Sequence, residues 1–429
     1  MHNKKYHIIT IGCQMNKSDS ERMASYLENI GFEPAPNERE ADLVVLATCG
    51  VRQSAEDRIY GLIPKIKKNN PKTKIILTGC LSERPDVKKR VTGQVDIWMN
   101  IKELAKLKSR LLGLDDDSIQ RDCDYLKEKP KYDSKVSAFV PIGNGCDNFC
   151  SYCVVPFARG REVYREAGEI IEEVKNLIGR GYKEITLIAQ NVNSYHEIDS
   201  SIDFPDLLKT VNDLEGDFWL RFTTSHPKDM SDKLIATMAK CEKFCEHLHL
   251  PAQAGDNDIL KAMNRNYTIE DYKELIKKVR AKMPDIAITT DIIVGYPGET
   301  KAQFKNTVKL FEEMKYDMAY VAQYSPRPNT AAAKLDDSVS RSDKRNREKE
   351  LMDIIRKTSL ENNQKYLNKI YPVLIEKKSK KGEWVGKTRS FKIVRIDNSK
   401  NFSNLKGKIV NVLISDVQDF GLRGEIIKK

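Results

Sequence analysis

Residues 144–153 read NGCDNFCSYC and place three cysteines, Cys146, Cys150 and Cys153, within eight residues. Three residues separate the first pair and two separate the second, and no fourth cysteine follows nearby. A structural zinc site is usually closed by four ligands. Iron–sulfur clusters are also held by cysteine thiolates, and three thiolates leave one iron of a four-iron cube open. The run therefore predicts a 4Fe-4S cluster with one free coordination position.

The cysteine run follows the first strand of a segment, about residues 135–360, in which strands and helices alternate. Each apolar stretch ends in polar, Gly or Pro residues, and four are followed by a credible helix. The predicted strands are SAFVPIGNG (137–145), EITLIAQNVN (184–193), FWLRFTTSHP (218–227), EHLHLPAQAG (246–255), IAITTDIIVGYPGE (286–299) and MAYVAQYSPRPNT (318–330). This alternation predicts a βα barrel or part-barrel, whose site lies at the C-terminal mouth of the strands. The cysteine run is expected at that mouth.

A second group of cysteines is spread over the first 120 residues. Strands continuous in Val, Ile and Leu alternate there with helical stretches, which predicts a doubly wound parallel sheet. Cys13, Cys49 and Cys80 each lie just past one of these strands, YHIITIGC (6–13), DLVVLATCG (42–50) and KIILTGC (74–80). Ligands bind beyond the carboxyl ends of strands in such sheets. We therefore expect three cysteines distant in sequence to meet at one edge and form a second metal site.

The last segment is basic and reads as a small antiparallel barrel. Residues 366–429 contain 15 Lys+Arg and 6 Asp+Glu, a charge of +9 out of +11 for the whole chain. Short strands are predicted at YPVLIEKK (371–378), EWVGKTRSFKIVRI (383–396) and GKIVNVLISDV (407–417). Such a module favours binding of a polyanion. Phe391, Trp384 and Phe402 lie among lysines and arginines, and the pattern leaves open whether they stack on RNA or form the core.

Cys241, Cys245, His247 and His249 superficially resemble a zinc set, because two thiols and two imidazoles occur within nine residues. The last three alternate, so they share one face of a strand. Residues strung along a strand do not converge easily on one ion. We expect packing roles for them.

Size and composition limit the class of protein. A chain of 429 residues exceeds one compact core, so two or three domains are expected. No run of about 20 apolar residues occurs, so no membrane span is expected. Nine cysteines in clusters favour metals or catalysis in a reducing compartment over disulfides. We expect a cytoplasmic protein.

The pattern CxxxC-x-aromatic-C at a barrel mouth resembles the radical S-adenosylmethionine (radical SAM) family. In that family the amino and carboxylate groups of S-adenosylmethionine fill the open iron position, and one electron from the cluster breaks the sulfonium. The resemblance implies that Tyr152 lies beside the cofactor's adenine and Gln190 near its amino nitrogen. Position at or near the ends of the later strands adds four cofactor-binding candidates, Ser225, Gln253, Asp291 and Gly295.

A three-cysteine site before the radical barrel and a basic barrel after it resemble the methylthiotransferases along essentially the whole chain. The resemblance implies a methylthiotransferase N-terminal domain over 1–120, a radical SAM core over 132–362 and a TRAM-like RNA-binding domain over 366–429. It assigns Cys146, Cys150 and Cys153 to the radical cluster. An auxiliary 4Fe-4S cluster, whose open iron carries the sulfur to be transferred, is assigned to Cys13, Cys49 and Cys80, and all six cysteines are predicted catalytic. One S-adenosylmethionine methylates that sulfur, and a second produces the deoxyadenosyl radical that takes hydrogen from the substrate.

Three branches of this family differ in substrate. GCQMNKSDSE (12–21), TCGVR (48–52) and CSYCVVPFARGRE (150–162) are similar to the branch that converts N6-isopentenyladenosine beside the tRNA anticodon to its 2-methylthio derivative. The branches acting on threonylcarbamoyl-adenosine in tRNA or on a ribosomal-protein aspartate typically read GCKVN and GCPKN at the first cysteine. The sequence Gln14-Met15-Asn16 therefore favours the first branch.

The implied partners are a tRNA substrate, a one-electron donor and, as an open question, a sulfur donor, and a monomer is expected. Two other classes remain as alternatives. One is an RNA-binding protein with structural metal sites, and the other is a radical enzyme acting on a small molecule. Because the charge excess lies in 366–429, we expect deletion of this segment to weaken tRNA binding without abolishing cofactor cleavage.

Overall fold

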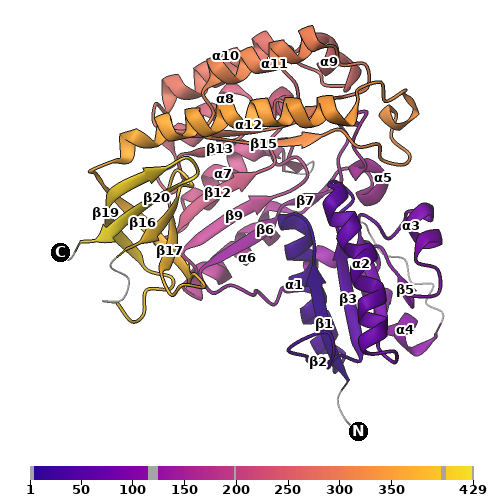
Figure 1. Ribbon diagram of the computed structural model, residues 1–429. Helices are drawn as coiled ribbons and strands as arrows, with labels where there is room; N and C mark the ends of the chain where they lie inside the picture. The colour runs from indigo at the N-terminus through magenta and orange to yellow at the C-terminus, as the bar shows by residue number, and fades with distance from the viewer. Residues whose placement is uncertain (1–3, 115–123, 198–199, 398–401, 428–429) are drawn as a thin grey trace.

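The structure is a computed structural model that describes residues 4–114, 124–197, 200–397 and 402–427. Three regions follow one another along the chain, indigo, magenta to orange, and yellow in Figure 1. The predicted domain end at residue 120 falls within 115–123, outside the described residues. None of the described helices is both long and apolar enough to cross a membrane.

The N-terminal region is a five-stranded parallel sheet in the order β2-β1-β3-β4-β5. Residues Leu43–Val45 of β3 show that helices cover both faces of this sheet. Val44 packs with α2 residues on one side, whereas Leu43 and Val45 pack with α1 residues on the other. The predicted doubly wound sheet is confirmed. Its elements are β1 (Lys5–Thr10), α1 (Gln14–Asn29), β2 (Glu33–Pro34), β3 (Leu43–Thr48), α2 (Gln53–Asn69), β4 (Lys74–Gly79), α3 (Pro85–Arg90), β5 (Ile97–Trp98) and α4 (Leu107–Leu112).

The central region is a part-barrel of parallel strands with helices outside. Two three-stranded sheets, β6-β9-β12 and β13-β14-β15, are joined by a bridge between Leu220 and Phe244. One apolar cluster fills the space between strands and helices. The six strands are β6 (Ser137–Pro141), β9 (Glu184–Ile188), β12 (Trp219–Thr223), β13 (His247–His249), β14 (Ala287–Val294) and β15 (Met318–Gln323). The predicted βα part-barrel is therefore confirmed.

Helices of the central region begin where side chains cap their first turn. Ser231, Thr268 and Thr300 each accept a hydrogen bond from a backbone N–H two or three residues into α8, α10 and α11, as such caps do. The helices are α5 (Val155–Arg159), α6 (Ala167–Gly179), α7 (Phe204–Asn212), α8 (Asp232–Lys240), α9 (Asn257–Ala262), α10 (Ile269–Lys282), α11 (Lys301–Met314) and α12 (Arg341–Asn363). Short strands β7 (Gly143–Asn144), β8 (Val163–Tyr164), β10 (His196–Glu197) and β11 (Ile202–Asp203) form two small hairpin-like pairs.

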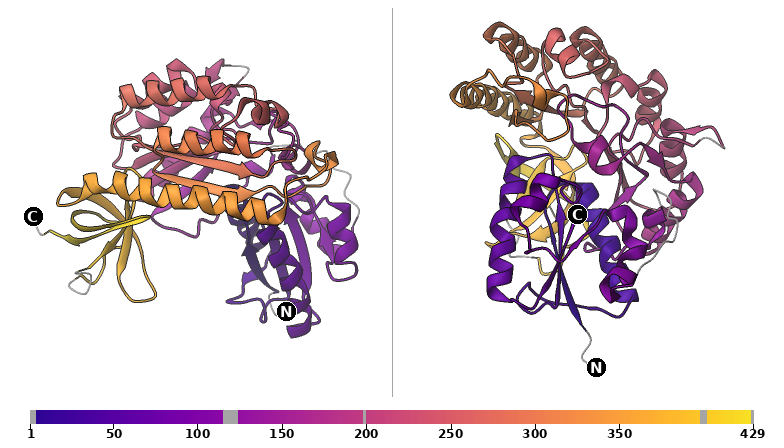
Figure 2. Two further views of the ribbon diagram at one scale, coloured as in Figure 1. Left: turned by 45° about the horizontal axis from the view of Figure 1, so that its top comes forward. Right: turned by 90° about the vertical axis from the view of Figure 1, so that its right-hand side faces the viewer.

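The C-terminal region is a closed barrel in the order β16-β17-β18-β20-β19. It is antiparallel as predicted except that β18 and β20 pair in parallel. Its strands are β16 (Ile370–Lys378), β17 (Trp384–Thr388), β18 (Ile393–Ile396), β19 (Ile409–Gln418) and β20 (Gly421–Ile426). The stretch 383–396, predicted as one strand, is divided in two by a turn in which Phe391 has φ +64°. Strand β20 was not predicted, because GLRGEI contains two glycines and little β-branched character. Figure 2 shows α12 running from the part-barrel to this barrel.

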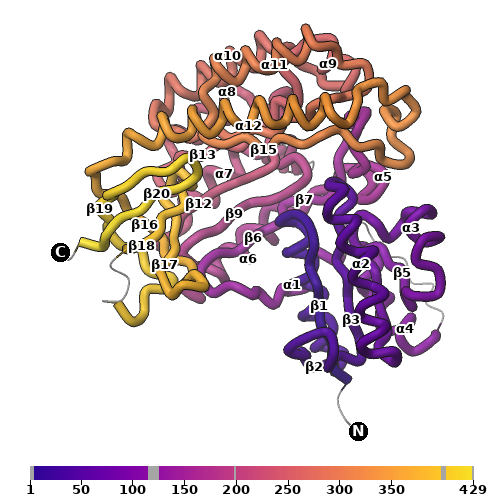
Figure 3. The backbone as a smooth tube through the Cα atoms, viewed as in Figure 1, coloured from indigo at the N-terminus to yellow at the C-terminus, as the bar shows by residue number. Residues whose placement is uncertain are grey.

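The two ends of the part-barrel are covered by different regions. At the start of the strands, Arg221 of β12 donates to the carbonyls of Thr388 and Arg389 at 2.9 and 2.7 Å. Glu184 of β9 accepts ion pairs from both Arg221 and Lys387. At the other end the strands point toward the N-terminal region, and the backbone trace shows α1 beside β6 (Figure 3). The C-terminal barrel therefore covers the floor of the part-barrel, which is the end where its strands begin. The N-terminal sheet lies at the mouth, where the strands end.

The three aromatic residues considered for RNA stacking are all engaged within the protein. Trp384 is buried, and its indole N–H donates to the carbonyl of Phe402 at 3.1 Å. Phe402 packs against the core of the C-terminal barrel. Phe391 stacks on His247 of the part-barrel with ring centroids 4.8 Å apart. The choice is thus resolved in favour of the core for Trp384, whereas Phe391 stays 42% exposed and Phe402 is only partly buried.

Candidate active site

The cysteine loop, residues 145–153, lies at the mouth of the part-barrel and is held by backbone hydrogen bonds. The N–H of Cys146 donates to the carbonyl of Gly160 at 3.2 Å, and that of Cys153 to the carbonyl of Cys150 at 2.9 Å. Gly145 has φ +88°, and a Cβ there would lie 2.0 Å from the carbonyl oxygen of Arg161. Only glycine fits this entry to the loop.

The three thiols of the loop lie close enough to influence one another. Burial raises the pKa of Cys146 and of Cys153, and the neighbouring thiol of Cys150 adds to both shifts. Three converging thiols are the ligand chemistry of an iron–sulfur cluster, which each thiol binds after losing its proton. Each thiolate of such a cluster binds a different iron. Among the described residues, no group of three His, Cys, Asp or Glu side chains is arranged to hold a metal ion.

A buried arginine that sequence reasoning missed contacts the cysteine loop. Arg265 Nη1 donates to Cys150 Sγ at 3.4 Å, and its Nε donates to the hydroxyl of Tyr267 at 2.9 Å. Its side chain is held further by the carbonyl of Pro251. Hydrogen bonds to cluster sulfurs and nearby charge set cluster potentials. Nothing in the spacing of MNRNY (263–267) signals this contact, since it depends on how the chain returns to the loop after α9.

The N-terminal cysteine group, Cys13, Cys49 and Cys80, meets at the carboxyl edge of its sheet. Cys13 is the N-cap residue of α1, and the other two follow β3 and β4. A Cβ at Gly12 would lie 2.7 Å from Cys49 Cβ, and one at Gly50 would lie 3.2 Å from Cys80 Cβ. Burial first, and then the charge of Cys80, raises the pKa of Cys49 to about 11. Strands β1 and β3 border the switch in strand order, where such sheets bind ligands.

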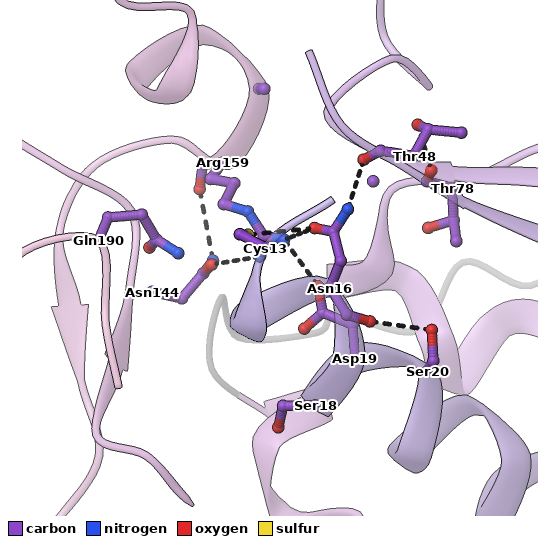
Figure 4. Close-up of polar contacts among 12 residues, drawn as sticks. Cys13, Asn16, Ser18, Asp19, Ser20, Thr48, Thr78, Asn144, Arg159 and Gln190 are labelled. Carbon is purple, nitrogen blue, oxygen red and sulfur yellow. Dashed lines mark hydrogen bonds and ion pairs between the residues drawn. The ribbon is translucent and has the colours of Figure 1, made fainter. Parts of the chain in front are cut away.

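The two cysteine groups face each other across the boundary between the N-terminal region and the part-barrel. A Cβ at Gly50 would lie 3.4 Å from Cγ1 of Val154, the residue after Cys153, and near Cys80 as well. Cys80 also contributes to the raised pKa of Cys153, after burial and the neighbouring thiols of the loop. Figure 4 shows the polar side chains that join Cys13 to this boundary.

Two of the cofactor-binding candidates have polar groups at the mouth. Ser225 is buried, and its hydroxyl has no hydrogen-bond partner among the described residues. Because buried hydroxyls are normally paired, this orphaned group fits a site that takes a polar ligand. Gln190 Oε1 accepts from the N–H of Gly145 at 2.5 Å, so it orients the cysteine loop. Tyr152 packs against the core of the part-barrel, inside that loop.

The other three candidates lie on or beside β14. Gln253 has φ +69°, and its N–H donates to the carbonyl of Asp291 at 2.9 Å. Asp291 Oδ2 is 3.3 Å from His249 Nε2. A Cβ at Gly295 would lie 2.4 Å from Lys344 Cγ of α12, so this glycine accommodates a helix side chain. The structure thus explains Gly295 by packing, and its cofactor contact stays a prediction.

The residues that resemble a zinc set serve the packing of β13. His247 Nε2 and His249 Nδ1 lie 3.2 and 2.9 Å from the hydroxyl of Thr289. Cys245 is buried with Trp219 in a small apolar cluster. The expected packing role is confirmed by these contacts.

Three family models match successive parts of the chain. The uncharacterized protein family UPF0004 matches residues 5–100, the radical SAM superfamily matches 140–311, and the TRAM domain matches 364–427. In fold, the chain is similar to the radical S-adenosylmethionine methyltransferase TsrM from Kitasatospora setae. That likeness has a TM-score of 0.55 at 16% identity, over 78% of this chain and 77% of the other.

Curated relatives match over the full length. A protein of Alkaliphilus oremlandii is 43% identical over 100% of this chain and 93% of its own. Those of Acetivibrio thermocellus and Carboxydothermus hydrogenoformans are 42% and 41% identical, over 99% and 100% of this chain and 91% and 100% of their own. All three are named tRNA-2-methylthio-N(6)-dimethylallyladenosine synthase. The chain therefore belongs to the tRNA-2-methylthio-N(6)-dimethylallyladenosine synthase family of radical SAM enzymes.

Proposed function

We propose that this protein converts N6-isopentenyladenosine beside the tRNA anticodon to its 2-methylthio derivative, and that its two cysteine groups hold two 4Fe-4S clusters. The observation that carries the proposal is the placement of two separate three-thiol groups face to face at one barrel mouth. Radical formation alone requires one cluster. A second thiol group within reach of the same mouth supports transfer of a sulfur atom.

The cysteine loop has the residues to bind the radical cluster and S-adenosylmethionine. When bound, they supply a radical able to take hydrogen from an unactivated C–H bond. Cys146, Cys150 and Cys153 hold the cluster, Gln190 fixes the entry of the loop, and Arg265 donates to the sulfur of Cys150. The unpaired hydroxyl of Ser225 binds the cofactor, with Tyr152 beside its adenine. Gln253, Asp291 and Gly295 complete the proposed contacts.

The N-terminal cysteine group would hold the auxiliary cluster at the edge of its sheet that faces the mouth. Thr48 fixes the geometry, because its hydroxyl donates to the carbonyl of Thr78 at 2.6 Å and accepts from the N–H of Leu81 at 3.2 Å. These bonds join the turn that carries Cys49 to the turn that carries Cys80. The substrate adenine then lies between the two groups.

The partners of this reaction follow from its chemistry. The basic C-terminal barrel binds tRNA through phosphate contacts, which makes the affinity fall steeply with salt. The radical step consumes an electron, so a one-electron donor is required, and a sulfur donor restores the auxiliary site. We propose a cytoplasmic monomer with domains over 1–120, 132–362 and 366–429.

Nucleoside mass spectrometry of tRNA from a deletion strain tests the proposal. The 2-methylthio derivative should disappear and N6-isopentenyladenosine should accumulate. Expression of the wild-type chain should restore the product, whereas a Cys146→Ala chain should not. Anaerobically reconstituted protein should hold about eight irons, from two cubane clusters. Unchanged nucleosides in the deletion strain would show that the activity is a different one.

A further inference from the structure

A buried arginine joins the two cysteine groups. Arg159 ends α5, and its side chain is 4% exposed. Its Nη2 crosses to the N-terminal region and donates to Asp19 Oδ2 at 2.7 Å and to Asn16 Oδ1 at 2.9 Å (Figure 4). Asn16 and Asp19 lie in the first two turns of α1, directly after Cys13.

On the side of the part-barrel, Arg159 is fixed to the cysteine loop. Its Nη1 donates to Asn144 Oδ1 at 3.0 Å, and Asn144 Nδ2 donates to the carbonyl of Arg159 at 3.5 Å. The next residue, Gly160, accepts the N–H of Cys146 at 3.2 Å. The guanidinium is therefore bonded to the residue directly before the cysteine loop, and the backbone beside it is bonded to Cys146.

On the other side, hydrogen bonds continue from Asn16 to the base of all three N-terminal cysteines. Asn16 Nδ2 donates to the carbonyls of Ile11 and Thr48, each at 2.9 Å. The hydroxyl of Thr48 donates to the carbonyl of Thr78 at 2.6 Å. These three carbonyls belong to residues one or two positions before Cys13, Cys49 and Cys80. One chain of bonds thus links the cysteine loop to the whole N-terminal cysteine group.

The charge of Arg159 is balanced, which makes its effect mainly geometric. Burial lowers the pKa of Arg159, but the carboxylate of Asp19 and the thiols of Cys80 and Cys13 raise it well above its usual value. The arginine therefore stays protonated and pairs with Asp19, which is 3% exposed. A planar guanidinium with several fixed donors holds its partners at defined angles, which an ammonium group does not.

We propose that Arg159 is a positioning residue that sets the distance and orientation between the two cysteine groups, and so the share of radical events that end in sulfur transfer. This inference rests on the proposed function. A misplacement on the order of 1 Å can lower the rate of a positioned reaction about 10²-fold. Loss of the arginine should separate radical formation from product formation rather than reduce both equally.

The test compares Arg159→Lys and Arg159→Gln with a matched control, Arg22→Gln. Arg22 is as buried as Arg159 and crosses the same boundary to Glu173 at 3.1 Å, but it bonds to none of the residues next to the cysteines. For each reconstituted full-length protein, deoxyadenosine and 2-methylthio nucleoside are measured in one assay. Pulsed electron paramagnetic resonance gives the distance between the two reduced clusters.

In both Arg159 variants, the methylthio product formed per deoxyadenosine should fall at least about tenfold, and the inter-cluster distance distribution should shift or broaden. Arg22→Gln should keep the wild-type ratio and distance. Unchanged ratio and distance in Arg159→Lys, which retains the charge and folds more readily than the Gln variant, would overturn the inference. Equal changes in Arg22→Gln would also overturn it, because they would indicate general loosening of the boundary. Failure of the wild-type protein to methylthiolate tRNA would refute only the proposed function, since the distance measurement does not depend on the substrate.

Discussion

The two cysteine groups contain the same three ligands but are built in different ways. The cysteine loop supplies its thiols from one short run, which local backbone bonds fold around Gly145. The N-terminal cysteine group takes its thiols from three turns at the edge of a sheet, with Cys13 and Cys80 separated by 67 positions. The first group is thus a local structure, whereas the second exists only when the sheet and its boundary with the part-barrel are formed.

This difference indicates which contacts each cysteine group depends on. The cysteine loop depends on the part-barrel beneath it, which the C-terminal barrel closes through Arg221 and Lys387. The N-terminal cysteine group depends on buried polar bonds between turns and across the boundary. Arg327 of the part-barrel, for example, donates to the carbonyl of Val51 at 3.0 Å, beside Cys49. Loss of one of these contacts should therefore affect one cysteine group more than the other.

The largest expected effect separates the two groups by chemistry. Cys49→Ala should abolish the 2-methylthio product while S-adenosylmethionine cleavage to deoxyadenosine remains measurable, because the part-barrel retains its own thiols. Both products are quantified in the same assay. The matched triple change of Cys146, Cys150 and Cys153 to Ala should remove about half of about eight irons and abolish both products. Methylthio product from a well-folded Cys49→Ala protein would remove Cys49 from the sulfur-transfer site.

Deletion of residues 366–429 should harm the cysteine loop more than the N-terminal cysteine group. From its charge alone, this segment was expected to be separable from cofactor cleavage, but its docking changes that expectation. Deletion removes Lys387 and the backbone acceptors of Arg221, which leaves Glu184 paired with Arg221 alone and exposes this end of the part-barrel to water. We expect lower stability of the part-barrel in urea and loss of cofactor cleavage along with tRNA binding. A truncated protein that cleaves S-adenosylmethionine at the full rate would show that cofactor cleavage does not depend on this segment.

Glu56→Gln should weaken the N-terminal cysteine group selectively. Glu56 binds Arg84 at 2.6 Å and Arg327 at 3.3 Å, and all three side chains are at most 7% exposed. Removing the carboxylate leaves Arg327 without the ion pair it makes with Glu56, while Arg84 keeps Asp86, and the loss of a buried partner costs about 3–5 kcal/mol. Urea unfolding and iron content after reconstitution measure the effect, with iron expected to fall toward that of one cluster. Asp213→Asn, which removes an exposed ion pair with Lys209, is the control and should change neither quantity.

Thr48→Val tests the bond between two of the N-terminal turns and should have a smaller effect. The change keeps the shape but leaves the carbonyl of Thr78 and the N–H of Leu81 without this partner. Such a loss costs about 1–3 kcal/mol in a buried site. Auxiliary iron should be lost faster on exposure to a chelator. Thr48→Ser retains the hydroxyl and should behave as wild type, and equal behaviour of Val and Ser would contradict the role of this bond.

Arg265→Lys should leave the iron content of both groups intact and alter only the properties of the cysteine loop. The lysine keeps the charge but loses the fork that reaches Cys150 Sγ and Tyr267 together. Because hydrogen bonds to cluster sulfurs help set the potential, the radical cluster should become harder to reduce. The midpoint potential is measured in a background in which Cys13, Cys49 and Cys80 are Ala. An unchanged potential would limit Arg265 to packing.

The limits of sequence reasoning follow the same division between local and assembled features. The cysteine loop could be predicted from its spacing and the strands from their apolar runs, because both patterns lie within short stretches of sequence. The turn at 389–392 and strand β20 were missed, since a positive φ at Phe391 and two glycines carry no strand pattern. Arg265 and Arg159 were missed for another reason. Their partners lie 115 and 143 or 140 positions away, and no local pattern records such a distance.

By itself, the sequence determined the order of elements, the doubly wound sheet, the part-barrel and the six cysteines as two groups, because hydrophobic period and ligand spacing are local quantities. Only the tertiary structure decided that the two groups face each other, that the C-terminal barrel closes the floor of the part-barrel, and that buried arginines join these regions. The physical reason is that a buried guanidinium is stable only where its hydrogen-bonding groups are matched by acceptors. Those acceptors come from segments that meet only when the chain has folded.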